Sequence, residues 1–302
     1  MDIKAFIESF SASLSSLGWY DAREIRTMAA YILKEVAGIE SYKIIVSPEQ
    51  ELGQTVSAIL QDITAQMAKG RPMQYVLGYE YFCGHKFNVS EGVLIPRPET
   101  EEIVRYVIAE AEVNALGGDM RILDLCTGSG CIAWSLAGAL PGSHVWGCDI
   151  SERALDIAKS QKIEDEVAGR VYFFRCDLLA VDALETIARV GKFDIVVSNP
   201  PYVCEGERSQ MRPNVLDFEP EEALFVPNDE PLLFYERIAE LSEGVLKEGG
   251  RLYFEVNEKF GAEVASMLGR SCFSGCEVVK DMFGKERMVK AKKIEKNGIT
   301  VG

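Results

Sequence analysis

Four consecutive residues, Asn199-Pro200-Pro201-Tyr202, carry groups that could handle a planar amine. They directly follow the apolar run 193–198, whose length and β-branched residues predict a buried parallel strand. The two prolines cannot continue a sheet ladder, because neither has an N–H. The tetrapeptide therefore stands at the carboxyl end of a strand, which is where ligands bind in open α/β sheets.

This tetrapeptide offers what is needed to methylate a planar –NH2 group. An amide or aromatic amine nitrogen is a poor nucleophile because its lone pair is delocalised. The Asn199 side-chain oxygen and the Pro200 carbonyl can accept both N–H bonds, which would aim the lone pair at a methyl donor. Tyr202 can pack on the face of the planar group. No strong base is required, since positioning and charge matching supply most of the effect. The structural alternative is that Pro-Pro merely ends the strand.

A glycine-containing turn is the second candidate site. The segment 124–133, DLCTGSGCIA, lies between a predicted strand and a predicted helix, and Gly128 and Gly130 let the backbone approach a ligand closely. Asp149 ends the next strand about 20 residues later, where a carboxylate accepts the two ribose hydroxyls in this fold. The alternative is a surface Asp ahead of a helix that Ser151 caps. Together the two features predict an adenosine-containing ligand.

Both NAD and S-adenosylmethionine would use this layout. Hydride transfer commonly needs His or a Tyr–Lys pair, and the chain has only two histidines. The tetrapeptide suits methyl transfer instead, so we favour S-adenosylmethionine.

The composition narrows the classes of function and partner. A net charge of −15 over 302 residues argues against general nucleic-acid binding and suits a protein partner or a small ligand. The eight cysteines include no CxxC pair, so we expect no metal site and reduced thiols. No signal peptide and no run of about 18 apolar residues is visible, and we expect a cytoplasmic protein.

The pattern of apolar residues predicts an α/β fold with three parts. Residues 1–74 show helical spacing, with a capping box at Asp21 and Glu24 and a further helix opening at Ser47-Pro48, and predict a small helical domain. No catalytic residue is visible in it, so it either serves packing alone or docks the substrate, and we assign it to substrate docking. Alternation over 75–97 predicts a β-hairpin linker. Residues 98–302 predict a doubly wound, Rossmann-like parallel sheet closed by an antiparallel hairpin. Its expected parallel strands are Arg121–Leu125, His144–Cys148, Val171–Arg175, Phe193–Ser198 and Arg251–Val256.

Three further segments make the assignment more specific. They are RPMQY at 71–75, LIPRPETE at 94–101, and Glu219-Pro220 with Ala223-Leu224. The tetrapeptide alone is typical of methyltransferases acting on adenine, cytosine or glutamine nitrogens. Combined with these segments, the chain resembles, over nearly its whole length, the HemK/PrmC family of N5-glutamine methyltransferases of peptide chain release factors.

The resemblance implies a set of site residues. The implied S-adenosylmethionine contacts are Cys126, Thr127, Gly128, Ser129, Gly130, Asp149, Asp177, Leu178 and Asn199, the residues just after Asp177 flanking the adenine. The implied catalytic residues are Asn199, Pro200 and Tyr202, and the implied substrate contacts are Asn199, Pro200, Pro201 and Tyr202. The implied substrate is the Gln of the Gly-Gly-Gln loop of bacterial class I release factors, and the cofactor product is S-adenosylhomocysteine.

The chain departs from the family pattern at three places. Cys126 replaces a usual Gly, Leu178 a frequent aromatic residue, and Val226-Pro227-Asn228 a more glycine-rich turn. These departures bear on the loop backbone, on the packing of the adenine and on a loop over the substrate.

Two other functions remain open. An adenine-N6 DNA methyltransferase should carry a basic target-recognition region, and none is visible. A catalytically silent adenosine-binding module would require the tetrapeptide to be merely structural.

Overall fold

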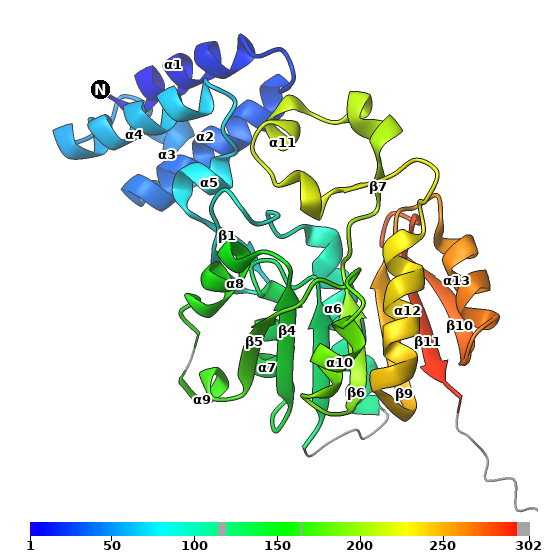
Figure 1. Cartoon of the computed structure of the whole chain (residues 1–302). Helices are drawn as coiled ribbons and strands as arrows, with labels where there is room; N and C mark the ends of the chain where they lie inside the picture. The colour runs from blue at the N-terminus through cyan, green and yellow to red at the C-terminus, as the bar shows by residue number, and fades with distance from the viewer. Residues whose placement is uncertain (114–118, 164, 295–302) are drawn as a thin grey trace, which may run out of the picture. The chain divides into compact units, whose positions relative to one another are not determined.

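The computed structural model describes residues 1–113, 119–163 and 165–294. They divide into two compact units (Figure 1). The first, the helical unit, comprises Met1–Gly78 and Met211–Phe218, and the second, the sheet unit, comprises Tyr79–Gln210 and the chain from Glu219 onward. Within the predicted domain 98–302, residues 114–118, 164 and 295–302 lie outside the described residues. The three-part division of the chain stays a prediction.

In the helical unit, the amphipathic helices α1, α2 and α4 bury one face on each other. Phe6, Phe10, Ile32 and Leu60 belong to its core. The capping box is confirmed: Asp21 Oδ1 accepts from Arg23 N and Glu24 N at 2.7 and 2.8 Å, and Asp21 N donates to Glu24 at 3.0 Å. The helices are α1 (Ile3–Ser15), α2 (Ala22–Ala37), α3 (Ser41–Val46), α4 (Gln54–Met67), α5 (Met73–Leu77) and α11 (Pro213–Leu216).

One local expectation is wrong, and a second is confirmed only in part. The helix expected to open at Ser47-Pro48 begins instead at Gln54. The preceding helix α3 ends at Val46, and Gln50 N donates to the Ser47 carbonyl at 3.0 Å, which closes a turn between the two helices. The hairpin is limited to β1 (Tyr79–Phe82) and β2 (His85–Asn88). The residues after β2 alternate between buried and more exposed positions without pairing in a strand. This alternation gave their sequence the two-residue period that is typical of a β-strand.

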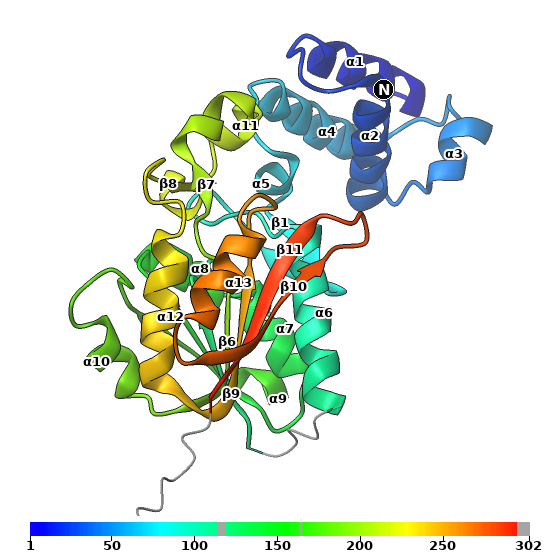
Figure 2. The same ribbon diagram turned by 90° about the vertical axis from the view of Figure 1, so that its right-hand side faces the viewer.

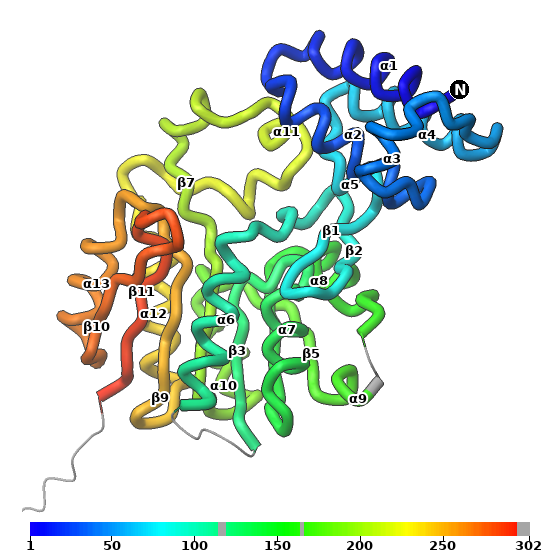
Figure 3. The backbone as a smooth tube through the Cα atoms, turned by 180° about the vertical axis from the view of Figure 1, so that it is seen from behind, coloured from blue at the N-terminus to red at the C-terminus, as the bar shows by residue number. Residues whose placement is uncertain are grey.

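The sheet unit holds a seven-stranded sheet of order β10-β11-β9-β6-β3-β4-β5. Five strands are parallel, as predicted: β3 (Arg121–Leu125), β4 (His144–Asp149), β5 (Val171–Arg175), β6 (Phe193–Ser198) and β9 (Leu246–Glu255). The predicted closing hairpin is present as β10 (Phe273–Lys280) and β11 (Glu286–Lys293), at one edge of the sheet (Figure 3). Outside the sheet, β7 (Val203–Cys204) pairs with β8 (Phe225–Val226).

Helices cover both faces of this sheet, so the parallel strands are apolar on both sides. Along β6, Ile195 and Val197 face one hydrophobic cluster while Val196 faces the other. The first cluster is closed by α6 (Pro98–Val113), α7 (Cys131–Ala139) and α9 (Asp165–Ala168), and the second by α10 (Ala183–Ala188), α12 (Leu233–Val245) and α13 (Gly261–Gly269). Figure 2 shows α6 and α12 on opposite sides of the strands. The remaining helix, α8 (Glu152–Lys159), follows β4. No helix among the described residues is long and apolar enough to span a membrane.

The strand order reverses between β3 and β6. The chain builds β4 and β5 on one side of β3 and returns to place β6 on the other, pairing Leu125 with Ser198. The Ser198 hydroxyl donates to the Leu125 carbonyl at 2.7 Å. The segments after these two strands therefore start side by side at the carboxyl edge of the sheet, where such a reversal leaves a crevice for a ligand.

Gly147 in β4 allows a close approach beneath the turn that follows β3. A Cβ at this position would lie 2.7 Å from Phe173 Cε1 and 2.7 Å from Thr127 Oγ1, closer than real contacts allow. The turn can reach its position only because β4 has no side chain here.

We expect Gly147→Ala to lower the free energy of unfolding by about 1–3 kcal/mol, because Phe173 and Thr127 must move to admit the methyl group. Urea unfolding followed by circular dichroism measures the change. Gly169→Ala is the control, since a Cβ there meets no atom within 4 Å. Equal stability of the two variants would contradict the close approach.

Candidate active site

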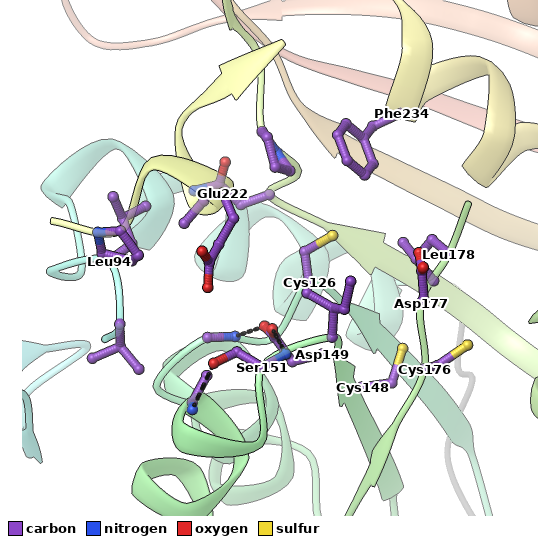
Figure 4. A pocket seen from close by; sticks show the side chains of 18 of the residues that line it. Leu94, Cys126, Cys148, Asp149, Ser151, Cys176, Asp177, Leu178, Glu222 and Phe234 are labelled. Carbon is purple, nitrogen blue, oxygen red and sulfur yellow. Dashed lines mark hydrogen bonds between the residues drawn. The ribbon is translucent and has the colours of Figure 1, made fainter. Parts of the chain in front are cut away.

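A pocket in the sheet unit lies at the carboxyl edge where the strand order reverses (Figure 4). It holds about 840 Å³ of empty space, part of it open to solvent. Seven of the residues predicted for the site line it: Cys126, Gly128, Asp149, Asp177, Leu178, Asn199 and Pro201. The other predicted residues, Thr127, Ser129, Gly130, Pro200 and Tyr202, lie outside the set that lines it.

The turn after β3 keeps a glycine-like backbone. Cys126 has a φ of 61°, in the left-handed region, and Gly128 and Gly130 have φ values of 54° and 79°. Thr127 N donates to the Cys148 carbonyl at 2.9 Å, which ties the turn to β4. The replacement of a usual Gly by Cys126 therefore leaves the left-handed conformation in place. Burial raises the pKa of the Cys126 thiol well above its usual range, so the group stays protonated.

Asp149 ends β4 and points into the pocket. Its Oδ2 accepts from Gly128 N at 2.9 Å and its Oδ1 from Ser151 N at 3.0 Å. Burial raises the pKa of Asp149, the two N–H groups oppose that rise, and the charge of Glu222 adds to it. Figure 4 shows the Glu222 carboxylate turned toward Asp149. Carboxylate oxygens anchored in this way keep lone pairs for the hydroxyls of a ribose.

The loop after β5 forms an apolar wall. Leu178 is buried and lines the pocket, and Phe234 lines it from α12 (Figure 4). Arg237, also on α12, donates to the Leu178 and Ala180 carbonyls at 2.7 and 2.8 Å and so holds the loop. The pocket thus has an aliphatic residue where the family often has an aromatic one, and it gains an aromatic ring from another element. Sequence reasoning missed Phe234, since nothing in the spacing links α12 to this loop.

The segments 92–94 and 220–223 form a second wall that was not among the predicted site residues. A buried carboxylate joins them: Arg97 Nη2 donates to Glu219 Oε1 at 2.5 Å, and Ile95 N donates to Oε2 at 3.1 Å. The signal was present in the sequence, because both segments carry motifs on which the family resemblance depends. The sequence did not reveal that the Arg97–Glu219 pair brings these two segments together.

The third departure from the family pattern, Val226-Pro227-Asn228, is held by backbone pairing and a hydrogen bond. Val226 lies in β8, and Asn228 Oδ1 accepts from Gly206 N at 2.7 Å. The turn 226–228 thereby fastens to the segment that follows the tetrapeptide.

Asn199 and Tyr202 share a hydrogen-bonded network. Asn199 Nδ2 lies 3.3 Å from Thr100 Oγ1, and Thr100 donates to Glu255 Oε2 at 2.6 Å. The Tyr202 hydroxyl donates to Glu255 Oε1 at 3.1 Å. Burial raises the pKa of Glu255, while these two hydroxyls and the charge of Arg287 favour its ionised form. Burial also raises the pKa of Tyr202 well above its usual range, so its phenol remains a donor.

Asp124 at the end of β3 is fully buried. Thr127 donates to its Oδ2 at 2.5 Å, whereas Oδ1 has no hydrogen-bond partner among the described residues. Burial raises the pKa of Asp124 to about 7 from an ordinary value of 3.8. The left-handed turn and the Asp149 carboxylate, which both line the pocket, fit a nucleoside such as S-adenosylmethionine.

Two family models match the chain: PrmC N-terminal domain over residues 8–78, and Methyltransferase small domain over residues 109–216. A release factor glutamine methyltransferase of Bacteroides thetaiotaomicron is 41% identical over 272 residues, which cover 90% of this chain and 94% of that protein. One of Flavobacterium psychrophilum is 37% identical and covers 96% of this chain and 99% of that protein.

Among solved structures, the hMettl16 catalytic domain in complex with MAT2A 3'UTR hairpin 6 aligns with a TM-score of 0.53 at 16% identity. The alignment covers 80% of this chain and 84% of that one. At such low identity the likeness concerns the methyltransferase fold alone.

We expect Asp124→Asn to stabilise the protein more at pH 8 than at pH 5. Between pH 3.8 and about 7 the folded parent binds more protons at Asp124 than the unfolded chain does, so its stability falls as the pH rises through this window. An amide lacks this dependence and still accepts from Thr127. Thermal melting of parent and variant at both pH values measures how the difference in stability changes with pH.

The control is Asp182→Asn, which removes the same charge from an exposed position. Its melting temperature relative to the parent should change little with pH. A parallel response of both variants would show that net charge, and not the burial of Asp124, is the cause.

Proposed function

The chain belongs to the family of release factor glutamine methyltransferases, and we propose that it transfers the methyl group of S-adenosylmethionine to the side-chain nitrogen (N5) of the glutamine in the Gly-Gly-Gln motif of bacterial class I release factors. The observation that carries the proposal is the meeting of two halves of a site in one pocket. Gly128 and Asp149 form the half that suits a nucleoside, and Asn199 and Pro201 form the half that suits an amide.

Each residue of the tetrapeptide has a proposed part. S-adenosylmethionine, when bound, supplies an electrophilic methyl group on a sulfonium ion. Asn199 Oδ1 and the Pro200 carbonyl accept the two N–H bonds of the glutamine amide and hold its nitrogen lone pair toward that methyl group. Because the Tyr202 hydroxyl is engaged by Glu255, its ring is the part that can pack on the amide plane. Pro201 keeps the turn rigid.

The same pocket supports the predicted cofactor contacts. Asp149 accepts the ribose hydroxyls, while Asp177 and Leu178, with Phe234, flank the adenine. Thr127, Ser129 and Gly130 act through the backbone of the turn, since Thr127 and Ser129 are buried and Gly130 is the N-cap of α7. These assignments belong to our proposal and rest on position in the fold.

A protein substrate suits this chain better than DNA. The formal charge of −15 would repel a polyphosphate backbone, and DNA-binding methyltransferases need positive charge around the extruded base. A cytoplasmic location follows for an enzyme that acts on translation factors.

We further propose that the helical residues 1–74 dock the release factor. The short helix α3 supports this idea, because none of its residues is buried and Tyr42, Ile45 and Val46 are 60%, 82% and 66% exposed. Neighbouring exposed apolar side chains of this kind mark contact surfaces.

We expect Asn199→Ala to reduce methylation of a release factor by at least about 100-fold, because one of two acceptors that hold the amide is lost. Affinity for S-adenosylmethionine should stay within about threefold of the parent, since the turn and Asp149 are intact. Radiolabel transfer measures the first quantity and calorimetry the second. Asn88→Ala, an exposed Asn of β2, is the control.

The same assay separates the two candidate substrates. A release factor and plasmid DNA are mixed with labelled cofactor, and label is counted on each. Label on the DNA, or unchanged transfer by Asn199→Ala, would overturn the proposed reaction.

We expect Ile45→Ser combined with Val46→Ser to raise the KM for the release factor roughly tenfold, as when one or two interface contacts of about 1 kcal/mol are removed. The kcat and the cofactor affinity should not change, because α3 lies in a different compact unit from the pocket. Val113→Ser, at an 85% exposed position of α6, is the control. An unchanged KM would reject docking through α3.

A further inference from the structure

We propose that Thr100 and Glu255 are positioning residues that fix the orientation of the Asn199 carboxamide. The inference deepens the proposed function and rests on it, because it gives Asn199 Oδ1 the part of an acceptor for the substrate amide. Neither Thr100 nor Glu255 lines the pocket, so they act only through Asn199 and Tyr202.

The three residues come from three elements that meet at the carboxyl edge of the sheet. Asn199 follows β6, Glu255 ends β9, and β6 and β9 are paired neighbours, with Ser198 opposite Phe254. Thr100 lies in the first turn of α6. Thr100 and Glu255 are 2% and 1% exposed, so water does not compete for their hydrogen bonds.

The direction of each hydrogen bond follows from the chemistry of the groups. Both Glu255 oxygens accept from hydroxyls, Oε2 from Thr100 at 2.6 Å and Oε1 from Tyr202 at 3.1 Å, so the single Thr100 proton lies toward Glu255. The Thr100 oxygen can then only accept from the carboxamide 3.3 Å away. Asn199 must therefore turn its NH2 group toward Thr100, and its Oδ1 points the other way. This result does not depend on telling oxygen from nitrogen in the carboxamide.

The orientation matters because a primary amide substrate presents two N–H donors. With Oδ1 turned toward it, Asn199 accepts one of them. A carboxamide rotated by 180° would present its own N–H groups to the substrate N–H groups and could hold neither. The chain Glu255–Thr100–Asn199 makes the productive orientation the favoured one before the substrate arrives, which is the kind of preorganisation that lowers a barrier.

The same carboxylate also holds the other end of the tetrapeptide, since Tyr202 donates to its second oxygen at 3.1 Å. Glu255 thus orients both Asn199, through Thr100, and Tyr202, the two residues that contact the substrate amide in our proposal. Burying a carboxylate at this depth opposes folding, and an apolar residue of similar size would stabilise the fold at least as well. A positioning role accounts for a charged group at this place.

The test compares Thr100→Val with Thr100→Ser. Valine keeps the shape and removes the hydroxyl, whereas serine keeps the hydroxyl. We expect Thr100→Val to lower kcat for a release factor roughly 10- to 100-fold, as when a group that orients a reacting residue is lost. The cofactor Kd should be unchanged, and Thr100→Ser should retain activity within about threefold of the parent. Single-turnover label transfer and calorimetry supply the values.

Thr186→Val is the matched control, because Thr186 is a part-buried threonine of α10 that lies outside the pocket and outside the proposed docking segment. Its kcat should equal that of the parent. A Thr100→Val kcat within twofold of the parent would overturn the inference, as would an equal loss in Thr100→Ser. Thermal melting of each variant shows whether a loss of activity comes from unfolding. If Thr100→Val is unfolded, Thr100→Ser tests the inference, because the inference requires this variant to be folded and active.

Asn199→Ala assayed alongside separates this inference from the proposed function. If Asn199→Ala is inactive and Thr100→Val is fully active, only the positioning role fails. If Asn199→Ala is itself active, the proposed acceptor site fails, and the positioning role fails with it.

Discussion

The pairing of β3 with β6 is the constraint on which the rest of the site depends. Strands added to one side of β3 and then to the other force the segments after β3 and β6 to diverge from a common edge. Cys126 and Asn199, 73 residues apart, then begin from adjacent strand ends, and the Ser198 hydroxyl fastens those ends together. A nucleoside half and an amide half share one pocket because of this topology.

Buried carboxylates concentrate at this edge, and each is met by a different donor set. Thr127 donates to Asp124, Arg97 and Ile95 donate to Glu219, and Thr100 and Tyr202 donate to Glu255. Such groups weaken a fold when they are left uncompensated, so the apolar clusters on both faces of the sheet must offset them. In return, Glu219 and Glu255 each hold distant segments of the chain at a defined separation, which a hydrophobic contact does less specifically.

The departures from the family pattern show that conformation, more than residue type, is what the pocket requires. Cys126 adopts the left-handed backbone of a glycine at a cost of about 1–2 kcal/mol, and the bonds of Thr127 and Ser198 on either side hold it there. Leu178 has no aromatic ring, yet Phe234 brings one to the same wall.

Sequence alone determined the parallel strands, the glycine turn, Asp149 and the tetrapeptide, because these depend on local periodicity and on turn chemistry at strand ends. It misjudged the start of α4 and the extent of the hairpin, since loop residues can alternate in burial without pairing. Only the tertiary structure decided which distant side chains come together, as when Phe234 and Leu178 line one pocket, Arg97 pairs with Glu219, and Thr100 bonds to Glu255. Such contacts join residues more than 50 positions apart, and they exist only after the sheet and its helices have packed, so no local pattern records them.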